Sequence, residues 1–277
     1  MNEIHQSIET IARYLSAGVL IAMLVWESFA PCYKFFLNRP GHRFKHGLIN
    51  LLLGFGNALI IGLVFISLWK LSSEWAASMG IGILHWFDLP VWMGAVVAVL
   101  LFDFWTYWWH RISHVIPFLW RFHRVHHSDP EMDVTTANRF HFGEIAISSL
   151  LRIPLIILIG AELWHIALFE VIMFPIVQFQ HANVRLPEWA DRSFRFFFAS
   201  PGMHKIHHSD RVKETNSNYT SMLSVWDRIF RSFRTREDLE NIRIGLEEFR
   251  TKEEQSVTGL LSNPLRSVSS RSRSSDG

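Results

Sequence analysis

Long apolar stretches alternate with short polar connections along this chain. Five of them approach the length of about 20 residues that a helix needs to cross a bilayer. They occupy residues 11–26, 48–69, 89–109, 145–159 and 163–179. The fourth run is short and contains Arg152, and Gly160 and Ala161 separate it from the fifth, so we expect these two to form a helical hairpin. The pattern as a whole predicts an all-α integral membrane helical bundle.

Charged residues between the runs predict an orientation in the membrane. The connection between the first two runs carries Lys34, Arg39, Arg43 and Lys45, whereas the next connection has only Lys70 as a basic residue. The positive-inside rule places the first connection in the cytoplasm. The third run then ends at the cytoplasmic face, and the hairpin returns to that face.

The region after the last run has a different pattern. Residues 186–249 mix polar and apolar positions, which predicts a cytosolic cap of short helices. Residues 266–277 read RSVSSRSRSSDG, a Ser- and Arg-rich sequence without apolar periodicity that is typical of disorder.

Composition agrees with a membrane protein and excludes several classes of function. The chain is 49% hydrophobic, with 12 Trp, 23 Phe and a mean hydropathy of +0.15, which is too apolar for an ordinary soluble domain. The single cysteine, Cys32, excludes an internal disulfide and a cysteine-based metal site. A net charge of +2 without a basic stripe argues against nucleic-acid binding. Metal chemistry in this chain must therefore rely on histidine.

Histidine supplies the strongest chemical signal. Eight histidines lie in three clusters, written HRISH, HRVHH and HKIHH, each beside an apolar run. Since positions i, i+3 and i+4 of a helix share one face, each cluster can direct two or three rings toward one point. First-row metal ions accept about four to six ligands, so eight rings fit a dinuclear site in the cap better than a single metal. The clustered residues are His110, His114, His123, His126, His127, His204, His207 and His208.

Two further polar residues lie on the same helical stripe as the first cluster. Asp103, Tyr107, His110 and His114 recur at i, i+4, i+7 and i+11 of the third run. In one interpretation Asp103 bonds the second ring nitrogen of a ligand histidine and fixes its tautomer. In the other, Asp103 bonds Tyr107 or a backbone group.

These motifs resemble a known family. The order HRISH, HRVHH and HKIHH, with a lone His181 in FQHANVRLP and the stretch NYTSMLSVWDRIFRSF at 218–233, is similar to the fatty acid hydroxylase and sterol desaturase superfamily. The resemblance covers roughly residues 100–249, and SPGMHKIHHSD followed by NYTSMLSVWDRIF looks closest to alkylglycerol monooxygenase-like and bacterial sterol desaturase-like members. It implies a membrane-bound non-haem di-iron enzyme that uses O₂ to hydroxylate or desaturate a lipid C–H bond. The lipid could be a sterol, a fatty acyl lipid or an ether lipid.

The resemblance also assigns residues and boundaries. It implies that the eight clustered histidines and His181 are metal ligands. We expect membrane-anchoring helices in residues 1–100 and a hydroxylase-like catalytic domain in 101–250, including the membrane hairpin at about 145–181. Residues 251–277 are expected to be a polar, disordered tail.

Residues near the second cluster are further candidates. His141 has three interpretations. It can fold back on the site as a metal ligand, it can support a ligand histidine or contact the substrate, or it can lie on the surface. Glu144 either bonds a ligand imidazole or caps the next helix, where a carboxylate is favourable. The remaining histidines are isolated and are interpreted as loop or interfacial residues: His5, His42, His46, His85 and His165.

An ionisable residue within an apolar run is costly unless it is paired. Glu170 lies eleven residues before His181 in the fifth run, on nearly the same face, and Arg152 of the preceding run is its expected partner. This pair is either structural or lines the cavity that receives the lipid.

The expected cofactors are two iron ions with O₂ as co-substrate, and zinc can substitute for iron in a purified sample because imidazole binds both. The cap lacks the cysteines of an iron–sulfur cluster, so we expect an external electron donor of the cytochrome, ferredoxin or pterin type. A zinc hydrolase is an enzymatic rival, although it needs only three protein ligands. A membrane metal transporter or a haem-binding electron carrier is the alternative from another class, and it would place histidines or acids near mid-bilayer.

Overall fold

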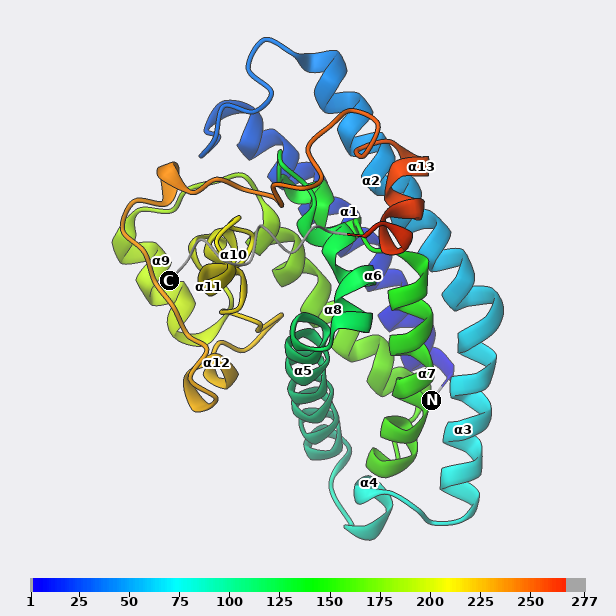
Figure 1. Cartoon of the computed structure of the whole chain (residues 1–277). Helices are drawn as coiled ribbons and strands as arrows, with labels where there is room; N and C mark the ends of the chain where they lie inside the picture. Colours follow the sequence, from blue (N-terminus) through cyan, green and yellow to red (C-terminus); the bar gives the residue numbers. More distant parts are fainter. Residues whose placement is uncertain (1, 268–277) are drawn as a thin grey trace.

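The computed structural model describes residues 2–267, and within them the chain is built from helices and connecting loops (Figure 1). In chain order the helices are α1 (Asn2–Phe29), α2 (Pro40–Ile60), η1 (Ile61–Phe65), α3 (Ile66–Ser78), α4 (Ile83–Trp86), α5 (Val91–Val115), α6 (Pro117–His127), η2 (Val134–Asn138), α7 (Phe142–Ile159), α8 (Leu163–His181), α9 (Glu188–Phe197), α10 (Pro201–His207), α11 (Val212–Thr215), α12 (Val225–Ile229), η3 (Leu239–Asn241), α13 (Val257–Ser262) and η4 (Asn263–Leu265). Between residues 2 and 267 there is no β-strand, only isolated bridges such as Pro31 with Val184. The all-α prediction is confirmed.

Within residues 2–267, four helical stretches are long and apolar enough to cross a membrane, which identifies a membrane protein. They are Pro40–Trp86, Val91–Val115, Phe142–Ile159 and Leu163–His181. The first includes α2, the π-helical η1, α3 and the short α4. The remaining predicted run, residues 11–26, lies within α1, whose apolar part is the shorter segment Tyr14–Phe29.

The third predicted run is longer in the structure than in the sequence analysis. Helix α5 continues past Trp109 to Val115, so His110 and His114 lie in its last turns. Ile116 is extended, as expected for a residue before proline, and Pro117 opens α6. This sharp connection brings the histidines of α6 back against those of α5.

Helices α7 and α8 follow one another through the short connection 160–162, and each is long and apolar enough to cross a membrane by itself, so the predicted hairpin stays a prediction. Gly160 ends α7 in the left-handed region with φ 74°. A Cβ at this glycine would lie 2.7 Å from Cδ2 of His85, so both the backbone angle and the close approach require glycine. Glu162 and His165 form a capping box at the start of α8. His165 is therefore a buried capping residue rather than the loop or interfacial histidine that the sequence suggested.

The apolar core joins the membrane helices. Phe102 of α5 and Phe169 of α8 stack with ring centroids 5.6 Å apart, and Phe65 of η1 and Trp69 of α3 belong to the same cluster. Helix α1 packs along α8. Figure 1 shows α6, α10 and the α1–α2 connection at one end of the bundle and α4 at the other. The histidine-bearing helices therefore share the end that carries the basic first connection.

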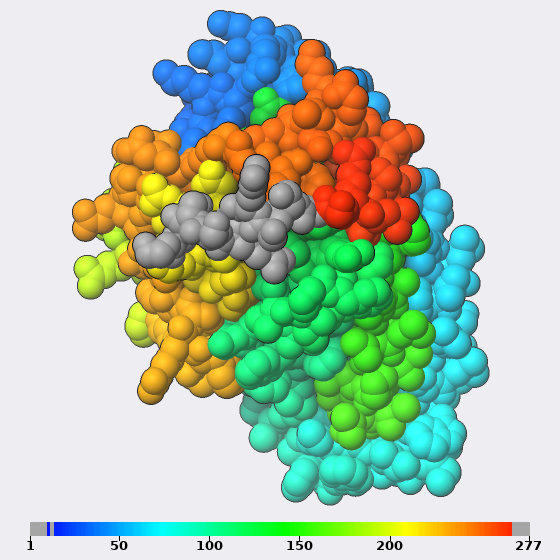
Figure 2. All heavy atoms as spheres, viewed as in Figure 1, coloured from blue at the N-terminus to red at the C-terminus, as the bar shows by residue number. Residues whose placement is uncertain are grey.

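The structure corrects the expectation of a disordered tail from residue 251. Residues 251–267 cross the cap and end at α13 and η4, seen in orange to red over α6 in Figure 2. Leu260 is buried, and Arg124 of α6 donates to Oδ1 of Asn263 at 2.7 Å and to the carbonyl of Arg266 at 2.8 Å. Single buried contacts of this kind leave no apolar periodicity in the sequence. The Ser/Arg-rich residues 268–277 lie outside the described residues.

Candidate metal centre

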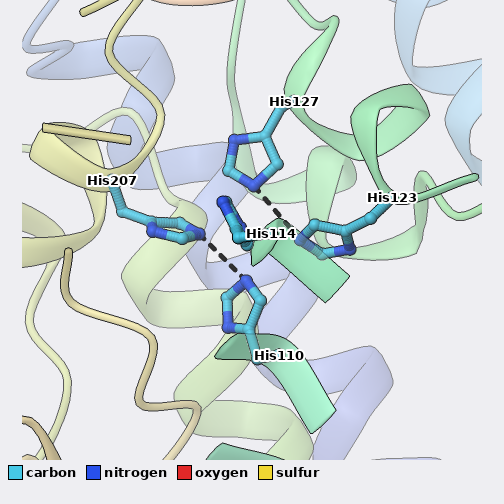
Figure 3. A group of neighbouring side chains, drawn as sticks. All are labelled: His110, His114, His123, His127 and His207. Atoms are coloured by element: carbon cyan, nitrogen blue, oxygen red, sulfur yellow. Dashed lines mark hydrogen bonds between the residues drawn. The ribbon is translucent and has the colours of Figure 1, made fainter. Parts of the chain in front are cut away.

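Nine histidines form two adjoining groups of rings. The first contains His110, His114, His123, His127 and His207, and the second His126, His181, His204 and His208. Within each group the nitrogens that could bind a metal lie within 4.8 Å of one another. Figure 3 shows five rings from three helices turned toward a common point. These nine are the residues to which the family resemblance assigns metal ligation.

Helical spacing explains how the pentapeptides of α6 and α10 each supply rings to both groups. On α6, His123 and His127 are four residues apart and join the first group, while His126 is rotated toward the second. The pentapeptide of α10 is divided in the complementary way, because its two histidines four residues apart join the second group and its third joins the first. Each motif thus gives two rings to one group and one to the other.

Local interactions hold α10 against the end of α8. Ser200 caps α10 by accepting a hydrogen bond from the Met203 amide at 3.2 Å, and Pro201 occupies the first turn. Lys205 is fully buried, and its Nζ donates to the carbonyls of Ala182 and Val184 at 2.8 Å each. These two carbonyls follow His181, so the lysine fixes α10 beside that histidine.

Several rings are oriented through Nδ1. His110 and His207 direct Nδ1 at the carbonyls of Tyr219 and Ser217, both at 2.6 Å. His181 directs Nδ1 at the Val177 carbonyl at 2.7 Å. Because a carbonyl can only accept, these Nδ1 atoms carry the proton, and Nε2 is left with a free lone pair. That is the tautomer a metal ligand bound through Nε2 requires.

The Nε2 atoms then face one another in a way that fits a cation. Nε2 of His110 and Nε2 of His207 are 2.9 Å apart, although both rings carry their proton on Nδ1. Two lone pairs at this distance repel unless a positive charge lies between them. Imidazole nitrogens in groups of five and four suit iron or zinc, so the donor set fits a pair of such ions.

Burial keeps five of the clustered histidines neutral. It is the main cause that lowers the pKa of these imidazoles well below the usual value, and the neighbouring rings lower it further. The residues concerned are His126, His127, His204, His207 and His208. Neutral imidazole is the form that binds metal.

His181 lies where the hairpin argument places it. Its ring belongs to the second group, with Nε2 at 2.9 Å from Nε2 of His204 and 3.1 Å from Nε2 of His126. It thus points into the cluster rather than toward lipid.

Glu144 and His141 have different positions. Glu144 accepts a hydrogen bond from Nδ1 of His123 at 2.8 Å, which is the imidazole-bonding alternative of the sequence analysis. His141 belongs to neither group. It caps α7 by accepting from the Gly143 amide at 2.9 Å, and its Nε2 faces the Leu261 carbonyl at 3.2 Å. Both its nitrogens are occupied, so the structure corrects the suggestion that it is a ligand.

Asp103 and Tyr107 do not contact the histidine rings, which corrects their suggested support of the metal ligands. Oδ2 of Asp103 accepts from Nε1 of Trp226 at 2.7 Å and from the Leu223 amide at 3.3 Å. The Tyr107 hydroxyl bonds Ser232 at 2.8 Å. Both side chains turn from α5 toward the cap, so the backbone alternative holds for Asp103 and both residues fasten the cap to the membrane helix.

Asp227, which positions one of the carbonyl acceptors, was not predicted from the sequence. Asp227 is fully buried and accepts from the amides of Tyr219 and Thr220 at 2.9 and 3.1 Å and from the Ser232 hydroxyl at 2.7 Å. It therefore fixes the peptide whose carbonyl orients His110. Its place in NYTSMLSVWD was the available signal.

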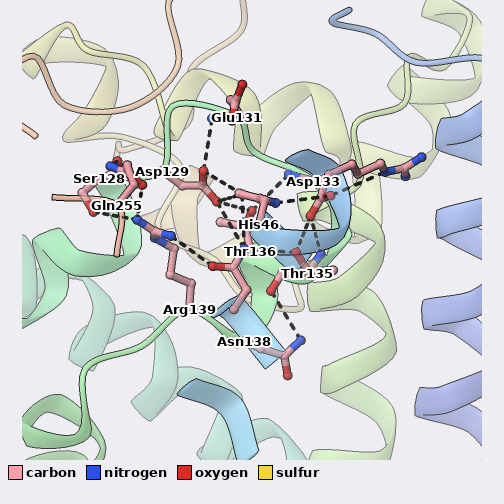
Figure 4. Close-up of polar contacts among 12 residues, drawn as sticks. His46, Ser128, Asp129, Glu131, Asp133, Thr135, Thr136, Asn138, Arg139 and Gln255 are labelled. Carbon is pink, nitrogen blue, oxygen red and sulfur yellow. Dashed lines mark hydrogen bonds and ion pairs between the residues drawn. The ribbon is translucent and has the colours of Figure 1, made fainter. Parts of the chain in front are cut away.

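A second missed feature is a buried polar network behind α6 (Figure 4). Asp129 accepts from Nε2 of His46 at 2.9 Å and from the Thr136 hydroxyl at 2.7 Å. Burial alone would raise the pKa of Asp129, but His46 and Arg139 hold it well below its usual range. His46 is therefore a buried ion-pair partner and not an interfacial histidine, which corrects its interpretation.

A cavity of about 630 Å³ connects the centre to the membrane helices. At one end it is lined by His110, His123, His126, His181 and His204. At the other it is lined by Arg152 and Glu170, whose Nη1 and Oε1 atoms are 2.7 Å apart. The predicted pair is thus present and borders the cavity.

Fold and site together define a helical membrane protein with adjoining polyhistidine groups at one end of an internal cavity. Residues 95–232 match the family model for fatty acid hydroxylase, a segment that contains all nine clustered histidines. The chain belongs to this superfamily.

Curated relatives agree. The chain is 29% identical over 223 residues to the ornithine lipid hydroxylase OlsE of Rhizobium tropici, covering 79% of this chain and 65% of the relative. It is 28% identical over 153 residues to human alkylglycerol monooxygenase, covering 53% of this chain and 32% of the relative. It is 24% identical over 142 residues to mouse cholesterol 25-hydroxylase, covering 50% of this chain and 46% of the relative. The chain thus spans less than two thirds of the length of these relatives. No solved structure shows a significant match.

Proposed function

We propose that this protein is a membrane-bound, non-haem di-iron oxygenase that hydroxylates or desaturates a lipid C–H bond with O₂ and external electrons. The observation that carries the proposal is the division of nine buried histidines into groups of five and four, with facing Nε2 atoms. When bound, the two irons supply the activation of O₂ that lets an unactivated C–H bond be attacked.

The protein's own residues orient the centre. The carbonyls of Tyr219 and Ser217 hold two rings with Nε2 turned inward, and Glu144 does the same for His123. A carboxylate acceptor also makes the ring a stronger donor to metal. The nine assigned ligands are the clustered histidines, and Asp103, Tyr107 and His141 act at a distance from them.

The cavity supports a lipid as substrate. Its wall combines apolar residues such as Ile61, Ile66 and Met173 with rings of the histidine centre, so an alkyl chain can lie against both. An apolar wall excludes water from the reacting carbon and favours a long hydrocarbon. The names of the relatives, which are lipid hydroxylases and a monooxygenase, point in the same direction.

We further propose that the centre faces the cytoplasm and receives electrons from a separate donor. The basic first connection lies beside the histidine region: Arg39 bonds Glu131 at 3.0 Å, four residues after His127. The positive-inside rule assigns such a connection to the cytoplasm. A reducing compartment also suits the reduction of iron.

Metal analysis and lipid analysis test the proposal together. We expect detergent-purified protein to hold about two irons per chain, as the two ligand groups require, without a haem absorption band. Cells expressing the protein should contain an oxidised lipid that is missing from cells without it. A haem band, or a lipid composition that does not depend on the protein, would overturn the proposal.

A further inference from the structure

The cavity has a polar end opposite the histidines. Arg152 projects from α7 and Glu170 from α8, and both line the same cavity as His181 and His123. The side chains keep 19% and 39% of their surface accessible. They are thus in contact with the cavity space rather than sealed in the core.

The pair retains unused hydrogen-bonding capacity. Arg152 Nη1 donates to Glu170 Oε1 at 2.7 Å, and the guanidinium lies over the Trp69 ring, 4.9 Å from its centroid. Among residues 10–11 and 14–267, whose side chains the structure describes, neither side chain has another hydrogen-bond partner. Among these described residues, the remaining guanidinium N–H groups and Glu170 Oε2 have no partner and can bind a ligand.

Helix geometry sets the separation between the two ends. Glu170 precedes His181 by eleven residues on α8 and Arg152 follows Glu144 by eight on α7. At 1.5 Å per residue these offsets correspond to about 16 Å and about 12 Å along the two helices. With the histidines at the membrane surface, the pair lies near the middle of a hydrocarbon core about 30 Å thick.

At that depth the pair selects among lipid groups. A pure hydrocarbon would displace water from these N–H groups and from Oε2 without offering them another hydrogen-bond partner, which costs free energy. A carboxylate or phosphate is repelled by Glu170, and an ammonium group by Arg152. A hydroxyl accepts from the guanidinium and donates to the carboxylate at once.

We propose that Arg152 and Glu170 form a binding subsite for a hydroxyl group of the lipid substrate and thereby set which carbon meets the histidine centre. The proposal rests on the proposed oxygenase function and makes it more specific. The substrate is a hydroxyl-bearing lipid, such as a sterol or a long-chain alcohol. Its oxidised carbon lies about 12 to 16 Å from that hydroxyl, the separation given by the helix rise.

Binding rather than turnover tests this subsite. Full-length protein in detergent is titrated with hexadecane, 1-hexadecanol, cholesterol, palmitate and hexadecylamine, and apparent affinities are compared within one detergent. We expect the two hydroxyl probes to bind about tenfold more tightly than hexadecane and more tightly than the charged probes, as expected from hydrogen bonds to charged groups. In Arg152→Met/Glu170→Met the preference for 1-hexadecanol over hexadecane should disappear.

A matched control is the exposed pair Lys70 and Glu74 on α3, with side-chain exposures of 62% and 61%. Lys70→Met/Glu74→Met should keep the wild-type preference. A preference that persists in the Arg152/Glu170 double variant, or a wild-type protein that binds hexadecane or a charged probe as tightly as the hydroxyl probes, overturns the subsite. The wild-type comparison decides even if the double variant fails to fold. Hydroxyl selectivity without any lipid oxidation would overturn the oxygenase and leave the subsite standing.

Discussion

Nε2 of His110 and Nε2 of His207 lie 2.9 Å apart, while Nδ1 of each ring faces a backbone carbonyl at 2.6 Å. Three elements converge in this contact, because α5 and α10 supply the rings and the loop 216–220 supplies the acceptors. The arrangement presents a lone pair from each ring to the same point. A cation at that point would convert their repulsion into two coordination bonds.

Removing one histidine from either group should remove metal and activity together. We expect His207→Ala and His126→Ala each to lower the iron content from about two to about one per chain, since they belong to different groups. Lipid oxidation should be abolished while both variants remain in the membrane. Iron analysis and lipid analysis of membrane fractions measure this. His85→Ala, at the α4 end of the bundle, is the control and should match wild type.

Glu144→Ala removes the acceptor of the 2.8 Å hydrogen bond from Nδ1 of His123. We expect the affinity for iron to fall by about 10- to 100-fold, because loss of such outer partners typically has this effect. Competition with a chelator measures the change. Glu131→Ala provides the comparison, because its carboxylate bonds Arg39 and His42 and none of the nine clustered histidines. Equal affinities in both variants would contradict the role assigned to Glu144.

Asp227→Ala leaves two buried amides and the Ser232 hydroxyl without an acceptor. We expect the free energy of unfolding to decrease by about 2 to 4 kcal/mol, from the cost of unsatisfied buried donors. The electronic spectrum of a bound cobalt probe should shift as well, because the Tyr219 carbonyl that orients His110 is released. Lost stability with an unchanged cobalt spectrum would confine Asp227 to a structural role.

The buried histidines predict a pH dependence for the metal-free protein. Their pKa is lowered in the native state, while the unfolded chain protonates them near 6.5. The unfolded state therefore binds more protons below about pH 6.5, and the free energy of unfolding decreases as the pH falls through that value. Above it, these rings contribute no pH dependence. Thermal unfolding midpoints between pH 8 and pH 5 measure the effect, and a midpoint that rises on acidification would be inconsistent with neutral rings.

The sequence predicted the features that depend on periodicity. The apolar runs predicted the membrane helices and the short connection at Gly160 between α7 and α8, since a span and a Gly-containing connection are local properties. The i, i+3, i+4 spacing singled out eight histidines, and the structure brings them together with His181. The pairing of Arg152 with Glu170 followed from the cost of an isolated charge in lipid.

Features that depend on distant chain segments were not predictable in this way. The acceptors of His110 and His207 are backbone carbonyls, which every residue possesses and no side-chain pattern reveals. Asp103 shares a stripe with His110, yet its partner Trp226 lies 123 residues away in sequence. His46 looked isolated because Asp129, its ion-pair partner, is 83 residues away.

The contacts of Arg139 bear on how the protein matures. Its guanidinium donates to Asn50 Oδ1 at 3.0 Å, to the Val125 carbonyl at 3.1 Å and to Gln255 Oε1 at 2.5 Å. The ribosome makes these three segments at widely separated times, because Gln255 follows Val125 by 130 residues. Helix α6 thus lacks part of its support until synthesis of this region is complete. We expect iron to be inserted only after Gln255 has been synthesised, into a chain whose membrane helices are already in place.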